Sequence, residues 1–287
     1  MTPPKPIVVG IGELLWDVFP TGKRAGGAPA NFVYHASQLG AQGYAISAIG
    51  DDDLGRELLK ELDDNRINYI CEKVTYPTGT VQVTLNNGQP SYEIVEGVAW
   101  DNIPLSQAAI DVVKQADAVC FGSLALRNSV SRRTILTLLD NTPQSAIRFF
   151  DVNLRQHYYS KELIEQLLGK ANVFKINDDE LKVLAPLFGL SGNEHEQCRA
   201  LLEKYHLDYV VLTAGEKYST VYGKAEMSRI DTPQVKVADT VGAGDSFSGA
   251  LVAGLLAGKP LRVAHEKAVE TAAFVCTKTG AWPAYTK

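Results

Sequence analysis

The chain has 287 residues, of which 45% are hydrophobic and 21% charged, and its formal net charge is −5. This composition predicts a soluble globular protein that folds as one domain over residues 1–287. The acidic balance, without a Lys/Arg cluster, argues against a nucleic-acid partner. No apolar stretch is long enough to span a membrane, and residues 1–10 do not resemble a signal peptide.

The four cysteines are scattered along the chain without a CxxC pair. This spacing predicts reduced thiols rather than a disulfide framework or a zinc site. We therefore expect a cytoplasmic protein.

Strands and helices alternate in the first quarter of the chain. Residues 7–11 form a continuous apolar run, which is typical of a strand buried on both faces. A helix over residues 31–39, a strand over 43–49 and a helix over 53–62 are expected next. This βαβα order predicts a parallel sheet with helices on both sides.

The alternation stops between residues 67 and 100. Residues 70–74, 80–85 and 91–95 have the polar alternation of short strands, and Asn86-Asn87-Gly88 supplies a hairpin turn. A block of hairpin inside an α/β chain predicts a small sheet that stands off the main body. Residues 13–24 are expected to contribute to it.

The α/β alternation resumes after residue 106. The expected strands cover residues 118–121, 148–151, 173–176 and 209–213, with helices between them. The last two helices, over 245–257 and 261–277, carry Ala and Gly at close spacing, which permits tight packing. The fold class expected is α/β, with a mostly parallel central sheet and a small second sheet.

The most informative segment is residues 239–249, with the sequence DTVGAGDSFSG. Gly242, Ala243 and Gly244 leave the backbone bare where a helix is expected to start, so its free N–H groups can receive an anion. Asp245 adds a carboxylate at the same point, and the helix dipole should keep it ionised as a weak, low-pKa base. An anion cradle beside a base predicts phosphoryl transfer to a hydroxyl; the alternative is a glycine-rich turn with an acidic cap.

Motifs for other chemistries fail. Gly10-Ile11-Gly12 lacks the third glycine of a dinucleotide-binding turn, because Leu15 stands there. Residues 50–57 have the P-loop spacing but carry Arg and Glu where Lys and Ser/Thr are needed. Ser246 is not in a hydrolase elbow, since Ser248 stands where glycine is required.

Polar residues follow several of the expected strands. Asp17 is either a turn cap or a ligand contact, and a sugar hydroxyl would suit its carboxylate. Asn177 and Glu180 lie one helical turn apart at the carboxyl edge of the sheet, where α/β proteins bind ligands; helix capping is the alternative. Arg155, after another strand, is a cation for a phosphate or sugar oxygen.

Five segments in order resemble the motifs of the ribokinase-like (PfkB) carbohydrate kinases. They are residues 12–17, 26–31, 151–155, 177–180 and 239–249, so the resemblance covers nearly the whole chain. It implies a ribokinase-like fold, in which a small β-sheet built from residues 13–24 and 67–100 forms a lid over the site.

The resemblance also implies roles for single residues. Asp245 would be the catalytic base, and Gly242, Ala243 and Gly244 the anion hole. The sugar would be held by Asp17, Gly27 and Asn31, with Arg155 beside it.

The implied cofactors are ATP and Mg²⁺, with K⁺ as an additional cation. Asn177 and Glu180 would act near Mg²⁺ through water. Thr213 and Gly215 resemble the nucleotide-binding turn, although Tyr218 stands where the family usually has glycine. Thr279 would lie by the purine, and Asp239 would help to hold K⁺.

The sugar motif departs from ribokinases proper, which have Lys where Ala28 follows Gly26-Gly27. Residues 96–103 and 151–155 are more similar to the bacterial fructokinases. Trp100 would then lie on the lid hairpin and offer an apolar face to the sugar; core packing is the alternative. Fructose is the expected acceptor, with 2-keto-3-deoxygluconate, ribose or a nucleoside as alternatives. A catalytically silent sugar-binding protein is the alternative of another class, and an exposed lid would suit a homodimer.

Overall fold

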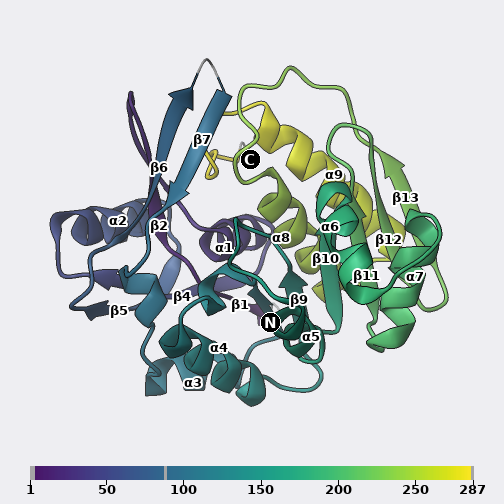
Figure 1. Cartoon of the computed structure of the whole chain (residues 1–287), viewed down its shortest axis with the longest axis horizontal. Helices are drawn as coiled ribbons and strands as arrows, with labels where there is room; N and C mark the ends of the chain where they lie inside the picture. The colour runs from purple at the N-terminus through teal and green to yellow at the C-terminus, as the bar shows by residue number, and fades with distance from the viewer. Residues whose placement is uncertain (1–3, 87–88, 286–287) are drawn as a thin grey trace.

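The computed structural model describes residues 4–86 and 89–285, and within them nine strands form one large sheet (Figure 1). The strands are β1 (Ile7–Ile11), β4 (Gln42–Gly50), β5 (Asn68–Val74), β8 (Ala118–Phe121), β9 (Ile147–Asp151), β10 (Val173–Asn177), β11 (Tyr209–Thr213), β12 (Tyr218–Gly223) and β13 (Met227–Asp231). Their order is β13-β12-β11-β10-β9-β8-β1-β4-β5. All pairings from β11 to β5 are parallel, whereas β12 and β13 are antiparallel. The expected α/β class with a mostly parallel sheet is confirmed.

Helices cover both faces of this sheet. One group packs on the face that carries Phe149: α1 (Ala28–Gln38), α2 (Asp53–Asp64), α8 (Ala243–Leu256) and α9 (Leu261–Cys276). The other packs on the face that carries Phe150: α3 (Gln107–Val113), α4 (Ser129–Asn141), α5 (Lys161–Leu168), α6 (Asp178–Phe188) and α7 (Glu194–Lys204). Successive strand residues point to opposite faces, so one apolar strand supplies both cores.

A second sheet stands off the body, as predicted. It contains β2 (Leu15–Phe19), β3 (Gly22–Gly26), β6 (Gly79–Asn86) and β7 (Gln89–Ile94) in the order β3-β2-β6-β7. Figure 1 shows β2, β6 and β7 rising from the body beside α1. We call this sheet the lid. Of the predicted hairpin turn, Asn87 and Gly88 lie outside the described residues.

The predicted bounds of the lid were wrong at both ends. Residues 67–74 are not part of it, because β5 pairs in parallel with β4 in the large sheet. That strand is at the sheet's edge and is mostly half-buried, which gives it the polar alternation of a lid strand. Residues 99–102 form the short helix η1 (Ala99–Asn102) in the body.

No helix in the described ranges combines the length and the apolar character needed to cross a membrane.

Candidate active site

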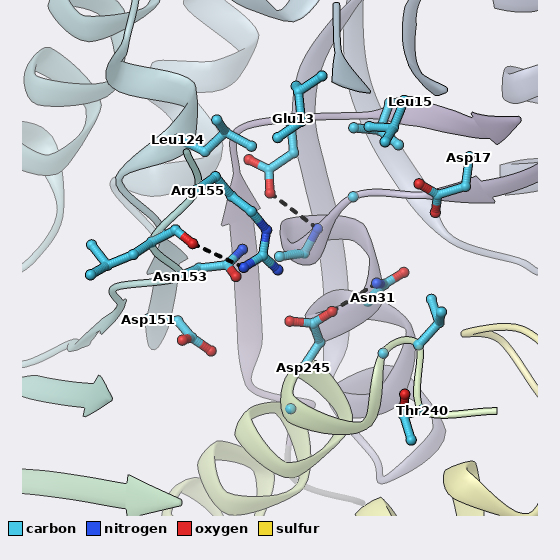
Figure 2. A pocket seen from close by; sticks show the side chains of 18 of the residues that line it. Glu13, Leu15, Asp17, Asn31, Leu124, Asp151, Asn153, Arg155, Thr240 and Asp245 are labelled. Atoms are coloured by element: carbon cyan, nitrogen blue, oxygen red, sulfur yellow. Dashed lines mark hydrogen bonds between the residues drawn. The ribbon is translucent and has the colours of Figure 1, made fainter. Parts of the chain in front are cut away.

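A cleft of about 740 Å³ lies between the lid and the carboxyl ends of the central strands. Side chains from the lid, from the ends of β9, β10 and β11 and from the start of α8 line it (Figure 2). It brings together ten of the residues that the sequence singled out: Asp17, Gly27, Asn31, Arg155, Asn177, Glu180, Thr213, Gly242, Gly244 and Asp245.

Asp245 is held in place by a chain of hydrogen bonds. Asn31 Nδ2 donates to Asp245 Oδ2 at 2.7 Å (Figure 2). Trp282 Nε1 in turn donates to Asn31 Oδ1 at 2.8 Å. Since the indole can only donate, it fixes which end of the Asn31 amide faces Asp245. Asn31 therefore positions the candidate base, a role that sequence analysis had not assigned to it.

The expectation of a low pKa for Asp245 was wrong. Burial raises the pKa of Asp245 to about 6; the nearby Asp151 carboxylate raises it further, and the bond from Asn31 opposes the shift. Desolvation outweighs the helix dipole because the carboxylate lies under the lid and against α1. Asp245 is thus a stronger base than an exposed aspartate and still mostly ionised at pH 7.

The glycines before Asp245 open the helix terminus as predicted. Gly242 precedes α8 with φ +76°, where only glycine is unstrained, and a Cβ there would lie 2.8 Å from Ala281 Cβ. The N–H of Ala243 donates to Thr240 O at 3.2 Å, so this donor is already engaged. The donors of the first turn that remain for an anion are those of Gly244 and Asp245.

The opposite side of the cleft carries the predicted sugar residues. Gly27 has φ +123°, and a Cβ there would lie 2.2 Å from Glu13 O, so no larger residue fits. Asp17 lies on the lid strand β2 beside Gly26. Burial raises the pKa of Asp17 to about 6, against the opposing charges of Arg155 and Arg24. Arg155 extends into the cleft between Glu13 and Asn31 (Figure 2).

Glu13 is a site residue that sequence analysis missed. Its Oε1 accepts the N–H of Ala28 at 3.3 Å, whereas Oε2 is buried and has no hydrogen-bond partner in the described part of the chain. Burial is the largest cause that raises the pKa of Glu13 to about 7, and Asp245 adds to it. In the sequence, Glu13 could have been found as an acidic residue two positions after the buried strand β1.

Lys175 and Asp151 form a second missed feature. They lie opposite each other on β10 and β9, and Lys175 Nζ is 2.7 Å from Asp151 Oδ2. Both side chains are buried at the floor of the cleft. The signal was a lysine inside the apolar strand from Val173 to Ile176.

Asn177 and Glu180 form a capping box at the start of α6. Asn177 Oδ1 accepts the N–H of Glu180 at 2.8 Å, and the Glu180 carboxylate accepts the N–H groups of Asn177 and Leu154, each at 2.9 Å. The capping alternative is therefore correct, yet both residues also line the cleft. No cluster of three metal-ligating side chains exists within residues 4–86 and 89–285. This donor set suits a hydrated Mg²⁺ rather than an all-protein cage.

The prediction for Trp100 was wrong, because the indole is fully buried in η1 and does not line the cleft. The Arg127 guanidinium lies 4.0 Å from the centre of its ring. Trp100 packs below the first residue of β6, where a Cβ on Gly79 would clash with it. The apolar face that the lid turns to the cleft comes instead from Leu15, Phe19, Val81 and Ile94.

Four further predicted residues do not line the cleft, and the first of them is Ala243, whose N–H is bonded to Thr240 and so is not free for the predicted anion hole. Gly215 follows Thr213 in the turn after β11, and Thr279 is exposed near the C-terminus. Asp239 pairs with Arg24 of the lid at 2.7 Å and accepts the N–H of Gly280 at 3.1 Å. Its carboxylate thus links the lid to the loop before α8, and K⁺ binding by Asp239 remains a prediction.

A family model described as the pfkB family carbohydrate kinase matches residues 9–286. The chain belongs to the PfkB family of carbohydrate kinases. The predicted family, fold and enzyme class are thereby confirmed.

Individual relatives agree over most of their length. An uncharacterized sugar kinase of Pyrococcus horikoshii is 29% identical, with 96% of this chain and 92% of that protein covered. Its structure in complex with ATP has a TM-score of 0.82 at 28% identity, covering 96% and 94% of the two chains. A fructokinase of Rhizobium leguminosarum is 29% identical over 87% of this chain and 79% of its own.

A Vibrio cholerae fructokinase, solved with fructose, ADP and calcium, shares the fold. Its TM-score is 0.80 at 22% identity, with 96% of this chain and 94% of that chain covered.

Proposed function

We propose that this PfkB kinase is an ATP-dependent fructokinase, which transfers the γ-phosphoryl group of ATP to a hydroxyl of fructose. The observation that carries the proposal is the pairing of Asp245 with the bare start of α8, opposite Asp17 and Gly27 across one cleft. Fructokinases are found both among the relatives by sequence and among the solved structures with the same fold.

In this mechanism the acceptor hydroxyl lies against Asp245, which orients it and takes its proton. The hydroxyl oxygen bonds to the γ-phosphorus as the bond to the β-phosphate oxygen breaks, and ADP leaves with the electron pair. The N–H groups of Gly244 and Asp245 receive the transferring group. Asn31 holds the Asp245 carboxylate in position for this proton transfer.

ATP would enter with Mg²⁺ on the side of Asn177, Glu180 and Thr213. Mg²⁺ would neutralise charge on the phosphates and keep several of its waters, one of them near the Glu180 carboxylate. Thr213, at the end of β11, adds a hydroxyl to this side of the cleft. We also propose a K⁺ site near Asp239, where the ion would displace the Arg24 guanidinium from the Asp239 carboxylate.

The charge of the cleft favours a neutral sugar over a sugar acid. Five acidic side chains line it, from Glu13, Asp17, Asp151, Glu180 and Asp245, against two cations, Arg155 and Lys175. Even with Glu13 partly protonated near pH 7, the negative charges outnumber the positive ones. At the acceptor end, Arg155 already faces Glu13 and Asp17. A keto-deoxy acid would therefore meet net repulsion there. The apolar lid face could cover the carbon side of a sugar ring.

A homodimer through the lid remains part of the proposal. An open sheet edge on the lid would pair with a second copy more readily than the helix-covered body would. Sedimentation of the wild-type protein tests this, and a monomer at micromolar concentration would exclude it.

The test of function is ADP release with a panel of acceptors: fructose, ribose, 2-keto-3-deoxygluconate and nucleosides. We expect fructose to give the highest kcat/KM. A hundredfold preference for another acceptor would overturn the fructose assignment and leave the kinase intact. No ATP turnover with any acceptor, despite measurable sugar binding, would indicate the silent binding protein instead.

A further inference from the structure

A buried ammonium lies against the anion-binding end of α8. A Cβ built on Gly244 would be 3.3 Å from Lys175 Nζ, and that nitrogen is the atom nearest to the position. Gly244, Asp245 and Lys175 all line the cleft. The site where an anion would meet the first-turn N–H groups is thus also within reach of a positive charge.

We propose that Lys175 completes the anion hole, with its ammonium contacting the transferring phosphoryl group and Asp151 holding it there. This inference rests on the kinase reaction but not on which sugar accepts the phosphate.

The position of Lys175 is hard to explain by folding alone. Its side chain points to the same sheet face as Val173, which packs in the apolar core shared with α8. Burying an ion pair costs desolvation energy, and apolar residues of similar size often stabilise a fold as well or better. A lysine at this position is better explained by a charge that the reaction needs.

Asp151 fixes the ammonium and keeps it charged. Burial alone would lower the pKa of Lys175, but Asp151 beside it raises the pKa above its usual value. Asp151 Oδ2 uses one of the three N–H donors of the ammonium at 2.7 Å. Ser248 Oγ lies 3.2 Å from the same oxygen and 3.0 Å from Gly244 O, which ties Asp151 to the first turns of α8.

The ammonium would act where charge builds up during transfer. As the acceptor oxygen approaches and ADP departs, negative charge spreads over the phosphoryl oxygens. Lys175 can offset that charge inside a buried site, where a fixed cation is worth more than in water. Its proton stays on the nitrogen throughout, and Asp245 takes the hydroxyl proton.

The test compares Lys175→Met with the double variant Asp151→Asn/Lys175→Met. The single variant leaves a buried unpaired carboxylate, whereas the double variant removes both charges and should fold normally. Lys170→Met is the control, because Lys170 forms a similar lysine–aspartate pair with Asp140 on the surface. Melting temperature, kcat and ADP affinity are measured for each protein.

Aluminium fluoride added to ADP and Mg²⁺ gives the readout specific to transfer, since it mimics the moving phosphoryl group. We expect both Lys175 variants to lose about 10²–10³-fold in kcat, the scale of one lost oxyanion donor. Their affinity for ADP alone should stay within about threefold of wild type, while the added affinity from fluoride disappears. The Lys170 control should match the wild type.

Two results would overturn the proposal. If the double variant recovered kcat to within about tenfold of wild type, Lys175 would serve only to neutralise Asp151. Fluoride that still tightened ADP binding to Lys175→Met would show that the ammonium does not meet the transferring group. A wrong acceptor is distinguishable, because the wild type would then respond to fluoride yet fail to phosphorylate fructose.

Discussion

The buried carboxylates of the cleft give the enzyme a pH dependence that an exposed site would not have. With the pKa of Asp245 near 6, the free enzyme loses its base as the pH falls through that value. We expect kcat/KM for the sugar to decline below about pH 6, rather than below about pH 4 as for an ordinary aspartate.

A pH–rate profile from pH 5 to 8 checks this expectation. Asp17 titrates in the same range, so the dissociation constant of the sugar is measured alongside. A profile that stays flat down to pH 5 would show that Asp245 is not perturbed as described.

The raised pKa of Glu13 makes the free energy of unfolding depend on pH. The folded protein keeps Glu13 protonated up to about pH 7, while the unfolded chain releases that proton near pH 4.5. The folded state thus binds more protons between these values, and stability falls as the pH rises through the window. Glu13→Gln should remove this loss. Relative to wild type, the free energy of unfolding of the ligand-free variant should be higher at pH 8 than at pH 5, by an amount on the order of 1–3 kcal/mol.

Urea unfolding of both proteins at the two pH values measures the difference. An equal gain or loss at pH 5 and pH 8 would mean that the Glu13 carboxyl does not change its charge in the folded protein.

At the scale of elements, the start of α8 leaves room for an anion that a side chain at Gly244 would fill. Gly244→Val would set a branched side chain at the anion's position, with its Cβ 3.3 Å from Lys175 Nζ. We expect turnover to fall sharply while sugar affinity changes little, because Asp17 and Gly27 lie across the cleft. Gly169→Val is the control, since a Cβ there meets only ordinary contacts at 3.4 and 3.6 Å. Parallel loss of sugar affinity and turnover would instead indicate local misfolding.

We expect the lid strand β2 to contribute specificity through Asp17. Asp17→Ala should cost about 2–4 kcal/mol in kcat/KM for the true sugar, because a charge-assisted hydrogen bond is lost. KM for ATP should move far less, since its predicted contacts come from other strands. Lys23→Ala on the neighbouring strand β3 serves as the control, because Lys23 pairs with Glu57 and lies over the Trp16 ring but does not line the cleft. If Asp17→Ala left every acceptor untouched, the sugar site would lie elsewhere.

The elements were largely predictable where local pattern and tertiary setting agree. The strands at 118–121 and 209–213 matched the structure to the residue, because buried parallel strands are continuous apolar runs. β5 was assigned to the lid because an edge strand shows the same polar alternation as a two-stranded ribbon. Trp100 was misplaced for a different reason: only the packing of η1 against Gly79 decides whether that indole faces solvent or core.

At the scale of the whole molecule, the site exists because the parallel strands β9, β10 and β11 end at one edge of the sheet and the lid stands over it. Motif order predicted which residues meet there, since Asp17, Asn31, Asn177 and Asp245 come from distant segments and line one cleft. The charges of Glu13, Asp151 and Lys175 were not predictable from spacing. Their importance depends on burial and on neighbours brought together by the fold.

Fructose-dependent ADP release by Asp245→Asn tests the central claim most directly. The substitution keeps the shape of the side chain and removes the base, so the melting temperature and the affinities for sugar and ATP should be retained. The account predicts a fall in kcat of roughly 10²–10⁴-fold, the range for a positioned acid–base group. A folded Asp245→Asn variant that turned over at nearly the wild-type rate would contradict it.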